Sequence, residues 1–184
     1  MPRNKTHKPS RRLADPVLEQ VADSWRLNNA INLLLIEAIP ARGFAAVPLA
    51  SRGRTVAQQL AHMHRVRVAW LRFQRAPEAR KLHSFRRGAS PSRHELKAAF
   101  HASGEAFANF LERMLICGER IKMFKGRAVR CMTYLVSHDS HHRGQIALAL
   151  HQAGIRLPDE IAINALWYSW YHGEKRYADV EARK

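Results

Sequence analysis

Apolar residues recur at helical spacing in four long segments of the chain, separated by stretches that contain proline and glycine. The segments cover about residues 15–39, 55–73, 92–118 and 127–152. Asp15-Pro16 is typical of a helix start, and Ser92 and Glu95 have the spacing of a capping box. No segment alternates between apolar and polar residues with period two for long enough to form a strand. The pattern therefore predicts an all-α protein.

Two connections of about 15 residues, 40–54 and 75–91, separate the first three predicted helices. Four helices with connections of this length predict a four-helix bundle with long crossover loops. A short C-terminal helix is expected over residues 158–171, where tryptophan and tyrosine are frequent. We divide the chain into a disordered basic tail, a bundle domain and a polar C-terminal tail, at residues 1–14, 15–172 and 173–184.

The composition agrees with a single folded domain. The chain has 184 residues, of which 46% are hydrophobic and 25% are charged, and this balance excludes a wholly disordered chain. No apolar run approaches the roughly 20 residues of a membrane span, and no apolar stretch follows the basic N-terminus as it would in a secretory signal. Two cysteines are too few for a disulfide scaffold. We expect a cytoplasmic protein.

The charge of the chain is strongly positive. Lysine and arginine number 31 against 15 acidic residues, which gives a formal net charge of +16, and the excess recurs in residues 75–97 and 120–130. Such a surface can attract nucleic acid, anionic lipid or an acidic small molecule. No zinc-finger, ribonucleoprotein-type or GxxG motif accompanies the charge. We therefore favour a solvated basic surface over nucleic-acid binding, and we expect no membrane partner.

The clearest chemical signal lies in the fourth predicted helix. His138 and His142 are one turn apart and about 40° apart around the helix, within a stripe of apolar residues. Two neutral imidazoles in this arrangement can both direct a ring nitrogen at one divalent ion, so the pair predicts a metal site. A protease of the HExxH type is excluded. The residue after His138 is Asp139, which is one methylene shorter than glutamate and lies about 100° from the histidine face.

A third ligand has to come from another helix, and the second helix offers His62 and His64. Each of them shares a flank of the helix with apolar residues, so the periodicity does not choose between them. Cys131 lies on the same face as His138, two turns earlier. We favour a packed core cysteine at this position over a fourth ligand or a reactive thiol.

Two sequence segments resemble the DinB family, a family of bacterial metal-binding helical bundles that is distinct from the DNA polymerase of the same name. The segments are residues 55–71, TVAQQLAHMHRVRVAWL, and residues 137–146, SHDSHHRGQI. Agreement extends into the first predicted helix and to residues 166–167, so the resemblance covers about residues 16–171. A helix that carries HxxxHRGQI is the most specific of these features.

The resemblance implies a four-helix bundle that often forms homodimers. It implies that His62, His138 and His142 bind a divalent ion, zinc or nickel, with an open coordination position. Some relatives are thiol-dependent transferases or isomerases that use low-molecular-weight thiols. A thiol of this kind is therefore an expected cosubstrate.

Two functions are compatible with these observations. The first is a metal-dependent enzyme of the thiol-transferase or hydrolase type that acts on a small molecule through a three-histidine site. The alternative is a non-catalytic, stress-associated metal-binding or interaction protein whose metal holds the bundle together. The catalytic residues are not assigned, because spacing does not choose among the candidates for a general acid or base. These candidates are Tyr134, Asp139, His141 and Glu95.

Helical spacing also predicts the environment of three residues near the histidines. Gln145 is expected at the edge of the site, either as a contact or as a polar residue at the border of the core. Arg143 is expected to point away and to form a structural ion pair, and Gly144 to let another helix approach closely. The aromatic segment 166–171 is expected to form a lid over the bundle, with a substrate pocket or a dimer contact as alternatives.

Overall fold

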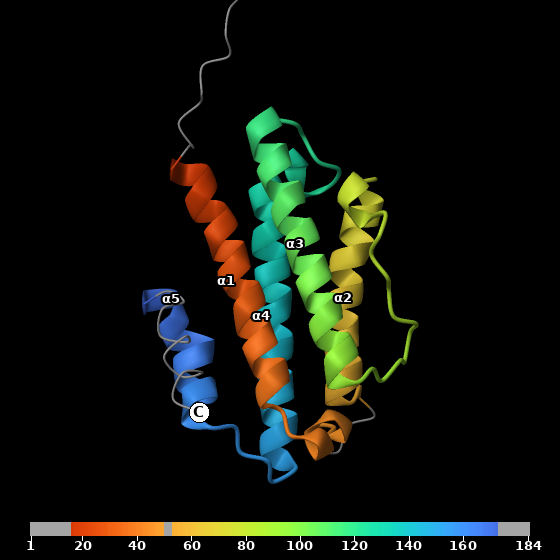
Figure 1. The fold of residues 1–184 in the computed structure, drawn as a ribbon, viewed down its shortest axis with the longest axis vertical. Helices are drawn as coiled ribbons and strands as arrows, with labels where there is room; N and C mark the ends of the chain where they lie inside the picture. Colours follow the sequence, from red (N-terminus) through yellow and green to blue (C-terminus); the bar gives the residue numbers. More distant parts are fainter. Residues whose placement is uncertain (1–15, 50–52, 173–184) are drawn as a thin grey trace, which may run out of the picture.

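A computed structural model describes residues 16–49 and 53–172, and within these ranges the chain forms helices and connections with no strand (Figure 1). Four long helices lie in this part of the chain: α1 Pro16–Ala38, α2 Val56–Phe73, α3 Arg93–Cys117 and α4 Ala128–Gln152. The predicted all-α class is confirmed, and each long helix occupies a segment that the apolar spacing predicts. Asp15 and the two predicted tails, 1–14 and 173–184, lie outside the described residues.

Shorter helices accompany the four long ones. They are the 3-10 turns η1 Ala41–Ala45, η2 Pro77–Ala79 and η3 Phe124–Gly126, the π-helix η4 Glu160–Tyr168, and α5 Ser169–His172. The short C-terminal helix predicted from residues 158–171 is therefore present, mostly as a π-helix. Nowhere in the described part of the chain is a helix both long enough and apolar enough to cross a membrane.

The four long helices lie side by side, with α1 and α4 running in one direction and α2 and α3 in the other (Figure 1). Helix α2 packs against α3 and α4, and α1 packs against the same two helices. Because α2 and α3 are parallel neighbours, the chain between them has to return over the length of a helix. The contact between α2 and α4 is the one that positions the candidate site.

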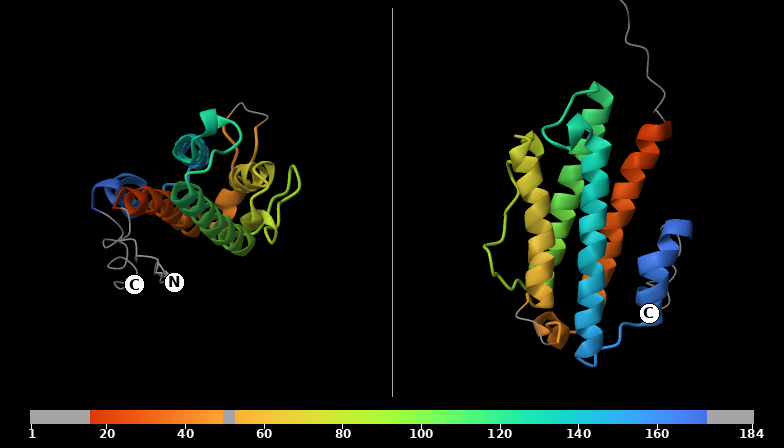
Figure 2. Two further views of the ribbon diagram at one scale, coloured as in Figure 1. Left: turned by 90° about the horizontal axis from the view of Figure 1, so that it is seen from above. Right: turned by 180° about the vertical axis from the view of Figure 1, so that it is seen from behind.

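The connection between α2 and α3 runs back along the outside of α2 (Figures 1 and 2). Side chains of α2 hold it in place. The Nη2 of Arg72 donates to the carbonyl of Leu82 at 2.9 Å. The Nε2 of His64 lies 2.9 Å from the carbonyl of His83. Polar residues on this flank of α2 thus bind a connection that belongs to the same chain.

Local sequence signals explain where two of the helices begin. Thr55 caps α2, and it forms a capping box with Gln58 in which each side chain bonds the backbone of the other residue. Ser92 and Glu95 form the same arrangement at the start of α3, as their spacing predicts. Gly118 ends α3 in the left-handed conformation, with φ 63°, which glycine adopts without strain.

Buried apolar side chains of the described residues form two clusters. One surrounds Trp25 and Phe107, and the other surrounds Leu60 and Phe100. Along α1, α2 and α4, a set of buried polar side chains falls between the residues of the two clusters. We call this set the polar layer. Its members are Asn28, Asn29, Asn32, Arg67, Asp139 and Arg143.

The aromatic C-terminal segment lies against α1, on the side away from α2 (Figures 1 and 2). Ala165 is buried there, whereas Trp167, Trp170 and Tyr171 are exposed. The segment expected to form a lid therefore packs on the flank of α1, and several of its large rings face solvent.

Candidate metal centre

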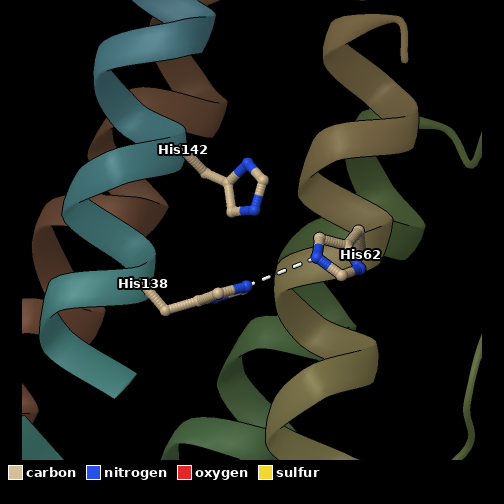
Figure 3. Close-up of side chains that lie close together, drawn as sticks. All are labelled: His62, His138 and His142. Carbon is tan, nitrogen blue, oxygen red and sulfur yellow. Dashed lines mark hydrogen bonds between the residues drawn. The ribbon is translucent and has the colours of Figure 1, made fainter. Parts of the chain in front are cut away.

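Three histidines from two helices converge between α2 and α4 (Figure 3). His62 comes from the middle of α2, and His138 and His142 come from successive turns of α4. The Nε2 atoms of His62 and His138 are 3.3 Å apart. One ring nitrogen from each of the three residues lies within 4.8 Å of the others. This group could hold a metal ion.

The spacing of the nitrogens fits the donor set of a small divalent ion. Zinc binds imidazole nitrogen at about 2.0–2.1 Å in tetrahedral geometry, which places neighbouring ligand nitrogens about 3.3 Å apart. The Nε2 atoms of His62 and His138 have this separation. His142 is buried, and the other two histidines are half-buried, so the group lies at the edge of the core and not at its centre.

The surroundings of His62 and His142 keep these two imidazoles neutral, which is the form that binds a metal. Burial lowers the pKa of His62 to about 4, and the nearby positive charges of Arg54 and Arg65 act in the same direction. Burial also lowers the pKa of His142 to about 4, with further contributions from His138 and His62. Near neutral pH these two rings therefore carry no charge.

Hydrogen bonds identify which nitrogen carries the proton in two of the rings, those of His142 and His62. The Nδ1 of His142 lies 3.4 Å from Oε1 of Gln59, and because that oxygen only accepts, Nδ1 is the donor and Nε2 keeps its lone pair. The guanidinium of Arg65 donates to Nδ1 of His62 at 3.3 Å, so the proton of His62 lies on Nε2. Metal binding through Nε2 of His62 therefore requires this proton to leave Nε2.

His64 does not join this group, although it lies only two residues from His62. Its Nε2 donates to the carbonyl of His83 at 2.9 Å, and its Nδ1 lies 3.0 Å from the hydroxyl of Ser103. Both nitrogens are therefore occupied inside the protein, and the ring packs against Phe85. Sequence periodicity left His62 and His64 equivalent, and the structure brings only His62 to the other two histidines.

An aromatic cluster adjoins one side of the histidine group. Tyr134 stacks on His138 with ring centroids 6.1 Å apart, and it also contacts Trp70 and Phe124. Tyr134 is exposed, so its hydroxyl is a reachable acid or base candidate. His141 is also exposed and lies beside His142, with ring centroids 5.3 Å apart.

Two other candidates are accounted for by local structure. Glu95 accepts hydrogen bonds from the backbone N–H and the hydroxyl of Ser92 in the capping box of α3, and this role explains its presence. Cys131 is fully buried, and burial raises the pKa of its thiol to about 12. The thiol is therefore protonated at neutral pH, which agrees with a packed core cysteine and not with a reactive thiol.

Two predictions from the helical wheel are wrong. Arg143 does not point away from the core but is buried, where its Nη1 donates to the Oδ1 atoms of Asn28 and Asn32 at 2.9 and 2.8 Å. Gly144 is exposed, and a Cβ built there meets no atom within 4 Å among the described residues, so no helix approaches it. The wheel describes one helix and cannot locate the neighbours that surround it.

The pairing of Arg67 with Asp139 was not predicted from the sequence. Both side chains are fully buried, and the Nη2 of Arg67 lies 2.5 Å from Oδ2 of Asp139. One signal could have revealed Arg67, because it lies on the apolar stripe of α2 together with Leu60 and Leu71. A charged residue at such a position predicts a buried partner.

Comparison with known proteins places the chain in a family. No curated protein matches it. The model of the DinB family matches residues 4–176, which is most of the chain and includes all three histidines of the group. This chain belongs to the DinB family.

Proposed function

We propose that this protein binds a divalent metal ion, zinc or nickel, through His62, His138 and His142. We further propose that it is a metal-dependent enzyme of the thiol-transferase or hydrolase type that acts on a small molecule. The observation that carries the proposal is the convergence of three imidazoles from α2 and α4, with two nitrogens 3.3 Å apart. Family membership is compatible with metal binding. We propose a four-helix bundle with a long crossover as the scaffold of the site.

An ion held by three neutral ligands supplies Lewis acidity, which makes a thiol or a water molecule a better nucleophile near neutral pH. The chain's own residues would orient the substrate. The rings of Tyr134 and Trp70 offer an apolar surface beside His138, and Arg54 and Arg65 place positive charge near His62. These features favour a substrate or thiol cosubstrate that carries negative charge.

The first test is the metal content of untagged protein, measured by mass spectrometry of the elements. We expect about one divalent ion per chain in the wild type and in His141→Ala, and much less in His62→Ala and His138→Ala. His141→Ala is the matched control, because His141 lies on the same helix, is exposed and lies outside the three-histidine group. A wild type that neither contains metal nor takes it up on titration would overturn the proposal.

The second test concerns the enzyme. Once a substrate is found among thiol-transfer and hydrolysis reactions, a chelator should abolish turnover and the identified metal should restore it. Turnover that persists in metal-free protein would exclude this mechanism.

One observation favours a non-catalytic alternative. The histidine group joins α2 to α4 directly beside the buried pair of Arg67 and Asp139, so a metal there would crosslink two helices of the core. In that case zinc would raise the melting temperature of the wild type and not of His138→Ala, and no substrate would be turned over. A rise of about 3 kcal/mol in the free energy of unfolding is expected at a zinc concentration 100 times Kd.

A homodimer remains a further proposal. The exposed rings of Trp167 and Trp170 on the flank of α1 support it, since large aromatic side chains are common at interfaces. Light scattering coupled to size-exclusion chromatography would give the mass. A monomer at high micromolar concentration would exclude a stable dimer.

A further inference from the structure

We propose that Asp139 is a positioning residue for His138, which it holds with the proton on Nδ1 and the lone pair of Nε2 directed at His62. The statement about the proton concerns the metal-free protein. Its consequence for metal affinity rests on the proposed function.

The first observation is a pair of buried polar atoms that face each other. The Nδ1 of His138 and the Oδ1 of Asp139 are both buried, and neither has a hydrogen-bond partner among the described residues. They lie 3.9 Å apart, slightly beyond hydrogen-bonding distance. A carboxylate oxygen can only accept, so the nitrogen that faces it is favoured as the protonated one. In a neutral imidazole the other nitrogen, Nε2, then has the lone pair.

The second observation is the way the carboxylate of Asp139 is fixed. Its Oδ2 accepts three hydrogen bonds, from Nη2 of Arg67 at 2.5 Å and from the amides of Asn28 and Asn32 at 2.8 and 2.9 Å. Three donors saturate this oxygen and leave Oδ1 for His138. Burial alone would raise the pKa of Asp139, but Arg67 and the hydrogen bonds hold it well below its usual range.

The polar layer also fixes the orientation of the two asparagines. The Oδ1 atoms of Asn28 and Asn32 both accept from Nη1 of Arg143, so their amide nitrogens have to face Asp139. The guanidinium of Arg67 is held in turn by Asn29 and lies against the rings of Trp25 and Phe100. The carboxylate therefore has little freedom to rotate, and Oδ1 stays directed at His138.

A third observation, on the Nε2 side of the His138 ring, supports the same position of the proton. The Nδ1 of His62 accepts from Arg65, so the proton of His62 lies on Nε2 and points at Nε2 of His138, 3.3 Å away. The Nε2 of His138 must then be the acceptor. Both neighbours of His138 thus favour the same proton position, and a carboxylate behind a ligating histidine also raises its basicity toward a metal.

The test uses Asp139→Asn in the full chain. Three donors surround the position of Oδ2, so the amide oxygen has to occupy it and the amide nitrogen has to face Nδ1 of His138. That nitrogen only donates, and the proton of His138 is therefore forced to Nε2. Nitrogen-15 correlation spectra of the metal-free proteins distinguish the two forms. We expect Nδ1–H in the wild type and Nε2–H in the variant, and a zinc affinity about 10–100-fold lower in the variant.

Asn32→Ala is the matched control. It removes one of the three hydrogen bonds to Oδ2 and lowers stability. Arg67 and Asn28 still donate to Oδ2 and keep Oδ1 facing His138, so the Nδ1–H form and the zinc affinity should persist. A wild type in which the proton of His138 lies on Nε2 would overturn the proposal, and this result does not depend on whether any variant folds. An Asp139→Asn protein that keeps both the wild-type proton position and the wild-type affinity would overturn it as well. The expected proton positions could be found while neither the wild type nor any variant binds zinc or nickel. In that case the positioning role of Asp139 stands and the proposed function fails.

Discussion

Arg67 of α2 and Asp139 of α4 form an ion pair whose side chains are both completely excluded from solvent. Asp139 directly follows His138 in the chain, and Arg67 lies little more than one turn beyond His62. The pair therefore sets the register of the two helices that carry the histidine group. Any sliding of α2 along α4 would separate the charges in a medium of low polarity, where an unpaired charge is very costly.

Removal of one partner of this pair should be strongly destabilising. Arg67→Met leaves the buried carboxylate of Asp139 with only the amides of Asn28 and Asn32, and we expect the free energy of unfolding to fall by about 3–5 kcal/mol. Urea denaturation gives this value. The double variant Arg67→Met with Asp139→Leu should lose less than the sum of the single variants, because neither Arg67 nor Asp139 is then left as a buried charge without its partner. A loss below about 1 kcal/mol for Arg67→Met would contradict the importance of the pair.

Two glycines in long helices should respond in opposite directions to alanine. A Cβ at Gly104 of α3 would lie 2.3 Å from Nδ2 of Asn29, which is buried and accepts a hydrogen bond from Arg67 through its Oδ1. We expect Gly104→Ala to cost about 1–3 kcal/mol of stability. Gly144→Ala should instead stabilise by about 0.5–1 kcal/mol, because it adds a helix-favouring residue in open space. Thermal denaturation of both variants measures these two changes in stability. Equal effects would contradict the close contact of Gly104 with Asn29 and the open space around Gly144.

The free energy of unfolding should fall at acidic pH, because His64 takes up a proton more readily in the unfolded chain than in the folded one. Burial lowers the pKa of His64 from 6.5 to about 4, so between these values the unfolded chain binds a proton at this residue and the folded chain does not. Stability therefore rises with pH across this window and is lost as pH falls, by up to about 3 kcal/mol. His62 and His142 act in the same direction in metal-free protein. The unfolding free energy of His64→Gln, measured with chelator from pH 7 to pH 4, should depend less on pH than that of the wild type. Identical slopes would exclude a role for His64.

The two cysteines should differ in reactivity. Cys117 is exposed at the end of α3, whereas Cys131 is buried with the pKa of its thiol raised to about 12. Because the thiolate is the reacting form, we expect Cys131 to react with an aromatic disulfide at least about 100-fold more slowly than Cys117 in the folded protein. The variant Cys117→Ser isolates Cys131, and denaturant should make it fully reactive. Rapid labelling of Cys131 in folded Cys117→Ser would contradict its burial.

Local features of the sequence were sufficient to predict the helices. The capping box of Ser92 and Glu95 acts within a few residues, and the structure contains it. The pair of His138 and His142 was equally predictable, because one turn of a helix fixes the distance between them. These properties depend only on hydrogen bonds and spacing inside one helix.

Contacts between helices determined which histidine of α2 joins the group and why Asp139 is buried. Both flanks of α2 that carry a histidine are apolar, so only the rotation of α2 against α4 could select His62 for the group and leave His64 to Ser103 and His83. On an isolated helix, Asp139 lies about 100° from the histidine face, and this angle does not reveal its burial. It is buried because Arg67, Asn28 and Asn32 arrive from two other helices and bond its carboxylate. A charge is stable in a core only when such partners surround it, and the positions of those partners are a property of the packed molecule and not of any one segment.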